Sequence, residues 1–308
     1  MLAFMLKRAA IIPPLLMIII TVSFFLIRFA PGSPLARERA VPAEVRASLE
    51  RYYGLDQPWH IQYTNYLRRL AQFDLGPSYK IPTVTVDELI ARSWPISAQL
   101  GLSAYALALL VGIPLGVLAA AHHRSLWDVG LRSIALLGMS LPTFVIGPLL
   151  ILLFSVTLLW LPPAGWGDAR HQILPAITLA APYVAYIARL TRSGVLDALA
   201  QEHIRVARAK GVRNSAVLWR HALRTGILPV VSFSGPALAF LLTGTVVVER
   251  IFAIPGLGNW FVQASFNRDY TLILGIVLVV STALLLMNLV VDIAYALLDP
   301  RIRYDRQG

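Results

Sequence analysis

Few side chains in this sequence are arranged for covalent chemistry. His122 and His123 are neighbours, and neighbouring residues point to different faces of a helix, so they are poorly placed to share a metal ion. Residues 101–105, GLSAY, lack the second glycine of the serine-hydrolase element G-x-S-x-G. The chain contains no nucleotide-binding G-x-x-x-x-G-K-[ST] and no zinc-binding H-E-x-x-H segment. We therefore predict a protein that is not an enzyme and that has no catalytic, metal-binding or cofactor-binding residue.

The most informative polar segment is residues 201–229, which read QEHIRVARAKGVRNSAVLWRHALRTGILP. Residues 202–210 have the pattern of a short helix, which Gly211 ends because glycine adopts positive φ without strain. Asn214 or Ser215 can cap a second helix, and its expected apolar face is Val217, Leu218, His221 and Ala222. The pattern predicts a basic, amphipathic helix–glycine–helix hairpin. Such a hairpin could lie on anionic headgroups, but its small residues favour the close approach of another protein.

The composition around this segment is that of a membrane protein. The 308 residues are 57% hydrophobic and 14% charged, with a mean hydropathy of +0.67, whereas soluble domains carry about 25% charged residues. The net charge of +11 is explained by basic cytoplasmic segments and anionic lipids rather than by nucleic acid. The chain has no cysteine, so it has neither disulfides nor thiolate metal sites. A soluble enzyme, a disordered tail and a secreted disulfide scaffold are excluded.

Apolar runs long enough to cross a membrane, which takes about 20 residues, place the hairpin between two spans. Six such runs are expected at residues 9–28, 96–121, 133–159, 174–190, 228–248 and 272–298. The first is longer than the apolar stretch of a signal peptide, about 7–15 residues, so we expect a retained helix. Six crossings put both termini on one side. Residues 189–226 contain eight basic and two acidic residues, which predicts that this side is cytoplasmic.

These spans divide the chain into four regions. Residues 1–30 form the N-terminus and first span, 31–94 an external and mainly helical region, 95–299 a core with five spans, and 300–308 a cytoplasmic tail. In the external region we expect one helix from Pro42 to Gly54. A second helix would be capped by Asp56, with an apolar face of Tyr63, Tyr66, Leu67 and Leu70. Residues 87–93 could lie at the membrane interface before Pro95 opens the second span. The region could be a small cap on the bundle or a docking surface.

Residues inside the core spans are candidates for a transport pathway. Prolines and glycines, among them Pro142, Gly147, Pro148, Gly235, Pro236 and Gly244, either permit bends or let helices pack closely. Glu249 is interpreted as a gate or loop anchor in preference to a substrate ligand, and Asp292 as a contact to the basic cytoplasmic segment. The predicted pathway or gate residues are Ser140, Thr143, Ser232, Thr243, Thr245, Glu249, Pro255, Gly256 and Gly258.

Several short segments together resemble one known family. Residues 207–211, ARAKG, followed by Leu228-Pro229, resemble the cytoplasmic EAA loop of type I ABC importer permeases. Further matches, in order along the chain, are APGSP at 30–34, GLDQP at 54–58, DLGPS at 74–78, ERIFAIPGLG at 249–258, RDY at 268–270 and LDPR at 298–301. They are similar to oligopeptide and dipeptide permeases of the B type. The sequence departs from the general loop pattern at Arg208 and in the longer gap before Leu228, as that subfamily does.

The resemblance implies an all-α, six-span permease of the bacterial inner membrane that forms half of a pathway for peptides, oligopeptides first and dipeptides next. It implies coupling to an ATPase subunit through Glu202, Arg205, Ala207, Arg208, Ala209, Lys210, Gly211 and Arg213. The implied partners are a homologous C-type permease, two cytoplasmic ATPase subunits that bind ATP and Mg²⁺, an external peptide-binding protein and membrane lipids, but not nucleic acid. Nickel and glutathione importers are alternatives. A secondary transporter or channel would need inverted repeats or intramembrane ion ligands, which we do not find.

Overall fold

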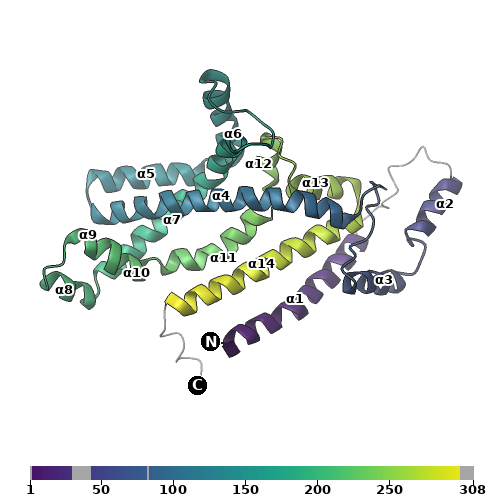
Figure 1. The fold of residues 1–308 in the computed structure, drawn as a ribbon, viewed down its shortest axis with the longest axis horizontal. Coiled ribbons are helices and arrows are strands. Elements are labelled where there is room, and N and C mark those ends of the chain that lie inside the picture. Colours follow the sequence, from purple (N-terminus) through teal and green to yellow (C-terminus); the bar gives the residue numbers. More distant parts are fainter. Residues whose placement is uncertain (1, 30–42, 82, 244, 299–308) are drawn as a thin grey trace.

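The structure is a computed structural model that describes residues 2–29, 43–81, 83–243 and 245–298, and this part of the chain is helical without a strand (Figure 1). Within these described residues, five helical segments are long and apolar enough to cross a membrane. They lie in α1 (Leu2–Phe29), α4 (Val86–Ala121), α7 (Ala169–Leu199), α11 (Leu228–Leu242) with α12 (Val246–Ile251), and α14 (Tyr270–Leu298). The predicted α-helical membrane fold is confirmed.

The predicted third span, residues 133–159, is a broken helix rather than a straight one. α5 (Leu126–Ser140) is followed by α6 (Thr143–Leu150) and the π-helical segment η1 (Ile151–Thr157), with a bend of 101° between them. The bend arises because Pro142 has no N–H group and holds Leu141 in an extended conformation, with φ −81° and ψ 120°. Counted as one crossing, this bent pair gives a sixth span.

Two other spans are longer than the sequence predicted. α4 begins at Val86, where the Thr85 hydroxyl accepts a hydrogen bond from the Glu88 N–H at 3.3 Å, so Pro95 lies inside the helix instead of opening it. Residues 87–93 are therefore the first turns of α4 and not a separate interfacial segment. α7 extends beyond the predicted 174–190 at both ends, with Asp168 as its cap. Both helices are longer than their apolar stretches because N-cap residues stabilise their starts and polar residues continue the helix.

The core of the bundle is the pair α4 and α7, which run side by side in the same direction (Figure 1). Gly112 and Gly116 let the two backbones approach closely. A Cβ at Gly116 would lie 2.6 Å from the Ala188 carbonyl oxygen, and one at Gly112 would lie 2.9 Å from the Val184 carbonyl oxygen. This four-residue glycine spacing is a common packing device of membrane helices.

α1 packs against α14, and the two helices run in opposite directions (Figure 1). Ile20 and Phe24 form a buried cluster with Leu274. Near the start of α1, Arg8 forms a 2.8 Å ion pair with Asp292, so the prediction that Asp292 contacts the basic hairpin segment is wrong. The start of α1 and the end of α14 thus lie at the same end of the molecule. Residues 300–308, the predicted tail, lie outside the described residues, as do residues 30–34 and Gly244.

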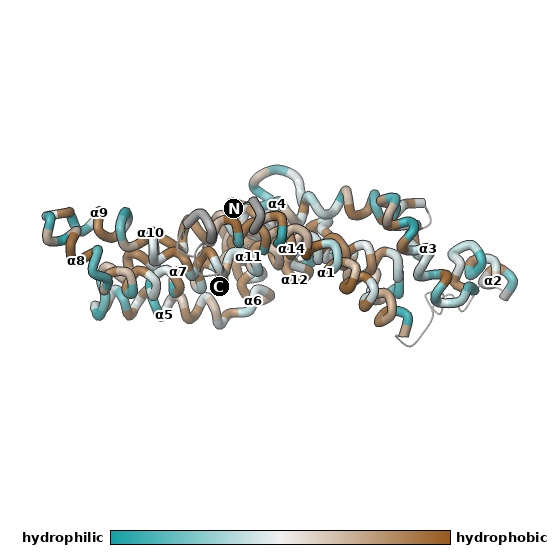
Figure 2. The backbone as a smooth tube through the Cα atoms, turned by 90° about the horizontal axis from the view of Figure 1, so that it is seen from below, coloured by the Kyte–Doolittle hydropathy of each residue, from teal (hydrophilic) through white to brown (hydrophobic). Residues whose placement is uncertain are grey.

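The segment after α1 contains α2 (Ala43–Tyr52) and α3 (Trp59–Ala71), at the end of the molecule opposite to α8 (Glu202–Ala209) (Figure 1). Both predicted helices are present. Asp56 does not cap the second one, because α3 starts after Pro58 and has no side-chain cap. Its predicted face is confirmed, since Tyr66 is buried against α1 and Tyr63, Leu67 and Leu70 pack beside it. Figure 2 shows hydrophilic residues concentrated at both ends of the molecule and hydrophobic ones between them.

Candidate functional site

The cytoplasmic hairpin predicted at residues 201–229 starts with α8, which ends in a glycine turn. Gly211 has φ +77°, its N–H donates to the Arg208 carbonyl at 3.0 Å, and the Val212 N–H donates to the Ala207 carbonyl at 3.2 Å. This pair of bonds is the Schellman arrangement that satisfies the last carbonyls of a helix. No atom lies within 4 Å of a Cβ built on Gly211, so glycine is needed there for its conformation and not for space.

The second half of the hairpin is formed by α9 (Asn214–Ala216), the π-helical segment η2 (Val217–Ala222) and α10 (Leu223–Gly226). Neither Asn214 nor Ser215 caps it, because the helix starts after Arg213 and has no side-chain cap. The predicted inner face is confirmed, since Val217 and Ala222 are buried and Leu218 and His221 are half-buried. π-helical geometry was not predicted, because it depends on how the segment packs rather than on its apolar spacing.

A small hydrophobic cluster attaches the hairpin to the ends of α4 and α7. Ile204 of α8 is completely buried, and it packs with Val117 and Ala120 of α4 and with Val195 and Ala198 of α7. Val212, beside the glycine turn, is half-buried against the same cluster. The hairpin is therefore part of the packed bundle rather than a loop lying free on the headgroups.

The tightest contact in this region is between two glycines that the sequence analysis did not single out. A Cβ at Gly194 of α7 would lie 2.0 Å from the Gly226 carbonyl oxygen, and a Cβ at Gly226 would lie 2.7 Å from the Gly194 carbonyl carbon. The backbones of α7 and α10 thus touch directly, at the point where the hairpin returns to the bundle. The only sign of this contact in the sequence is the glycine at each position, and a glycine by itself does not show which residue packs against it.

The predicted coupling residues separate into one inward residue and seven outward ones. Ala207 is buried and belongs to the apolar face of α8, so its small size serves the packing of the hairpin itself. The outward residues, all exposed, are Glu202, Arg205, Arg208, Ala209, Lys210, Gly211 and Arg213. They form a mainly cationic surface on α8 and the turn after it.

At the other end of the bundle, four of the predicted pathway residues line one cavity of about 540 Å³. Its walls come from α6, α7, α11, α12, α13 (Leu257–Asn267) and α14, and the four residues are Thr143, Thr243, Thr245 and Gly258. The Thr245 hydroxyl is buried and has no hydrogen-bond partner among the described residues. The cavity is mainly apolar, with aromatic and aliphatic walls that include Tyr183 and Phe240.

Glu249 lies beside this cavity, fully buried, and binds the start of α13. Its carboxylate accepts a hydrogen bond from the Ser97 hydroxyl at 2.7 Å and another from the Asn259 N–H at 3.2 Å. The Ser97 hydroxyl in turn accepts one from the Leu257 N–H at 2.8 Å. A carboxylate is favourable at a helix N-terminus because the unpaired N–H groups there carry partial positive charge. Glu249 has the contacts expected of a loop anchor.

Gly256 leaves room for this carboxylate, since a Cβ there would lie 2.4 Å from the Glu249 Cδ atom. A Cβ at Gly258 would lie 3.0 Å from a carboxylate oxygen of Glu249. Pro255 is exposed in the same turn. Ser140 and Ser232 do not line the cavity, and their hydroxyls bond carbonyls of their own helices, Leu136 and Leu228. The structure thus brings together most, but not all, of the predicted pathway residues.

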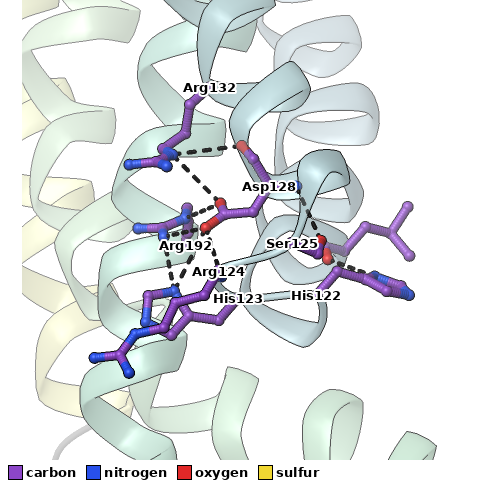
Figure 3. Close-up of polar contacts among 8 residues, drawn as sticks. His122, His123, Arg124, Ser125, Asp128, Arg132 and Arg192 are labelled. Carbon is purple, nitrogen blue, oxygen red and sulfur yellow. Dashed lines mark hydrogen bonds and ion pairs between the residues drawn. The ribbon is translucent and has the colours of Figure 1, made fainter.

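A buried carboxylate at the start of α5 was also missed. Asp128 is fully buried, and the Arg192 guanidinium donates to both of its oxygens at 2.7 Å (Figure 3). The Arg124 N–H, the Arg132 side chain and His123 surround the same carboxylate. Ser125 and Asp128 have the spacing of a capping box, which was the available clue. Among the described residues, no group of three or more His, Asp and Glu side chains could hold a metal ion.

Comparison with known proteins identifies the family to which this arrangement belongs. Residues 112–304 match the family model described as the inner membrane component of binding-protein-dependent transport systems. The chain is 44% identical, over 99% of its length and 100% of the relative's, to the oligopeptide transport system permease protein OppB of Salmonella typhimurium. It is 41% identical to the dipeptide transport system permease protein DppB of Bacillus subtilis, over 99% of each chain.

A solved structure shows the same fold at low sequence identity. A chain of the MetNI methionine ABC transporter, in an inward-facing conformation, superposes with a TM-score of 0.56. The match covers 68% of this chain and 96% of the other, at 16% identity. The family match, the full-length relatives and the fold lead to one conclusion: the chain belongs to the family of inner membrane permease components of binding-protein-dependent ABC transport systems.

Proposed function

We propose that the chain is the B-type permease of an ATP-driven importer of peptides, oligopeptides first and dipeptides next. The names and full-length coverage of its relatives support this substrate class. The cavity beside Glu249 has a suitable chemistry, since threonine hydroxyls among apolar walls can satisfy peptide amides without selecting a charge. A homologous C-type permease would supply the other half of the pathway, and a peptide-binding protein would deliver substrate at the external face. Both termini would be cytoplasmic.

We propose further that the hairpin transmits movement from an ATPase subunit to the bundle. As a permease the chain is not an enzyme, so the ATP and Mg²⁺ would be bound by two partner subunits. The observation that carries the proposal is the backbone contact between Gly194 and Gly226. Because this contact has no side chain to deform, a displacement of the exposed cationic face of α8 moves α7 with it. Alternating access would then follow as a rigid-body switch between two packings.

The glycine turn offers a direct test of coupling. Gly211→Pro removes the N–H that binds the Arg208 carbonyl, and it forces φ to about −65° in place of +77°. We expect peptide-stimulated ATP hydrolysis by the reconstituted importer to fall to the unstimulated rate, while membrane insertion and complex assembly remain. The matched control is Gly211→Asn, which tolerates positive φ and should keep the stimulation. Wild-type stimulation in the proline variant would disprove coupling through this turn.

A further inference from the structure

A second cavity, separate from the proposed pathway and coupling surface, lies between α4, α5 and α7. Its volume is about 520 Å³, and most of its wall is aliphatic, from residues such as Leu107 and Val111 of α4 and Leu136 of α5. At one end, however, three arginines line it: Arg132 of α5, and Arg189 and Arg192 of α7. The shape is thus an apolar groove that ends in a cluster of cations.

The positive charge at this end exceeds the negative charge that faces it. Arg192 is only 17% exposed and is bound through two nitrogens to Asp128, which holds it in place (Figure 3). Arg132 is 52% exposed and reaches the same carboxylate only at 3.5 Å. Arg189 is exposed and has no ion pair among the described residues. One carboxylate therefore faces three guanidinium groups: it is bound closely by Arg192, it is only loosely paired with Arg132, and Arg189 has no ion pair with it.

The arginines lie at a position along α7 that we expect to be close to a membrane surface. The 31 residues of α7 extend about 46 Å, more than the hydrocarbon core of about 30 Å, so its end projects from the membrane. Arg189 and Arg192 lie two to three turns before that end. At the start of α5, the exposed side chain of Trp127 has the position and character of an interfacial anchor, and exposed Leu126 lies beside it in the chain. Arginines at this level can extend their head groups toward the surface.

We propose that this groove binds an anionic phospholipid, with an acyl chain along α4, α5 and α7 and the phosphate between Arg132 and Arg189. Charge complementarity selects this occupant. An apolar helix of a second permease could fill the groove but would leave the arginines without an anion, and a soluble anion would leave the apolar wall exposed. Basic pockets between membrane helices at the cytoplasmic side are a known lipid-binding arrangement. The lipid would hold α5 against α7, next to the Asp128 ion pair.

The test uses the whole importer complex, purified in mild detergent and titrated with phosphatidylglycerol, with bound lipid counted by native mass spectrometry. The double variant Arg132→Gln/Arg189→Gln should bind phosphatidylglycerol about 30-fold more weakly. Each basic residue near an anionic surface contributes about 1 kcal/mol to binding, and about 2 kcal/mol for the pair corresponds to this change in affinity. The control Arg68→Gln, on the exposed surface of α3, should leave binding unchanged. Phosphatidylcholine should bind the wild-type complex no better than it binds the double variant.

A second variant tests the groove without changing charge. Ala181→Phe places a large side chain in the groove and should also reduce phosphatidylglycerol binding, with complex assembly as the check on folding. Glycerol phosphate, which carries the anion without acyl chains, should not displace the lipid. Equal lipid binding by wild type and both variants would overturn the proposal, as would full displacement by glycerol phosphate or capture of a second permease by a photo-crosslinker at Leu136. Because lipid is counted directly, loss of peptide-stimulated hydrolysis alone would not affect the result.

Discussion

The two ends of the bundle are held by different kinds of contact. At the hairpin end, Gly194 and Gly226 bring two backbones together, and no rotamer change can relieve or break that contact. At the end that carries α13, the Glu249 carboxylate holds the turn through hydrogen bonds to Ser97 and Asn259. A side chain can exchange one hydrogen-bond partner for another. Two helices whose backbones touch must instead move together or separate. This difference supports our proposal that the hairpin end transmits motion, and it suggests the hypothesis that the α13 end opens and closes.

The largest expected effect comes from breaking the backbone contact. Gly194→Ala would place a Cβ 2.0 Å from the Gly226 carbonyl oxygen, so the two helices must separate. We expect a destabilisation of about 3 kcal/mol, the upper part of the range for overpacking, together with loss of peptide-stimulated ATP hydrolysis. Thermal unfolding of the purified complex measures the first, and a hydrolysis assay measures the second.

The matched control for this variant is Gly130→Ala in α5, because no atom lies within 4 Å of a Cβ built there. It should leave the stimulated rate at the wild-type value and should not lower the unfolding temperature, because alanine is a better helix former than glycine. If Gly194→Ala behaved like Gly130→Ala, the rigid attachment of the hairpin would be contradicted.

A smaller effect is expected at the α13 end. Ser97→Ala removes the donor to Glu249 and the acceptor of the Leu257 N–H, which leaves buried polar groups unpaired at a cost of about 1–3 kcal/mol. We expect the turn to open more often, so that a cysteine at Thr245 reacts faster with an impermeant external thiol reagent. Ser103→Ala is the control, since in the described part of the chain the Ser103 hydroxyl bonds only the Leu100 carbonyl of its own helix. Equal labelling rates in the two variants would rule out Glu249 as a gate anchor.

The smallest effect should come from the ion pair between α1 and α14. Arg8 and Asp292 are 41% and 26% exposed, and exposed ion pairs contribute about 0–1 kcal/mol. Asp292→Asn should therefore lower the unfolding temperature only slightly, and the difference from wild type should shrink at high salt because ions screen exposed charges. A decrease in unfolding temperature as large as that in Gly194→Ala would mean that α1 is fixed to the bundle as firmly as the hairpin is.

Local features of this protein were predictable from sequence, whereas contacts between distant residues were not. α8 and the turn at Gly211 follow from a short apolar pattern and a glycine, both local. The burial of Ala207 depends on α4 and α7, which no neighbouring residue reveals. Composition identified the apolar segments, but the bend after Ser140 was noted only as a possibility at Pro142.

The same limit applies to the polar residues of the site. Glu249 was recognised because an acid near an apolar span is costly, but its partner Ser97 is 152 residues away. Asp128 went unnoticed because its partner Arg192 is 64 residues away, on another helix. Asp292 was assigned to the wrong partner, since basic residues are abundant and the sequence does not say that α1 lies beside α14. The threonines of the cavity were predicted by type, and their convergence depends on the fold.

The proposed contact between the hairpin and an ATPase subunit can be tested by cross-linking. Because the chain has no cysteine, a single Arg208→Cys substitution in the assembled importer provides one cross-linking site on the exposed face of α8. Arg68→Cys, also at an exposed position, on α3 at the opposite end of the molecule, is the control. We predict that a short bifunctional cross-linker joins the first variant, and not the second, to the ATPase subunit. Cross-linking to the ATPase from Arg68→Cys and not from Arg208→Cys would contradict it.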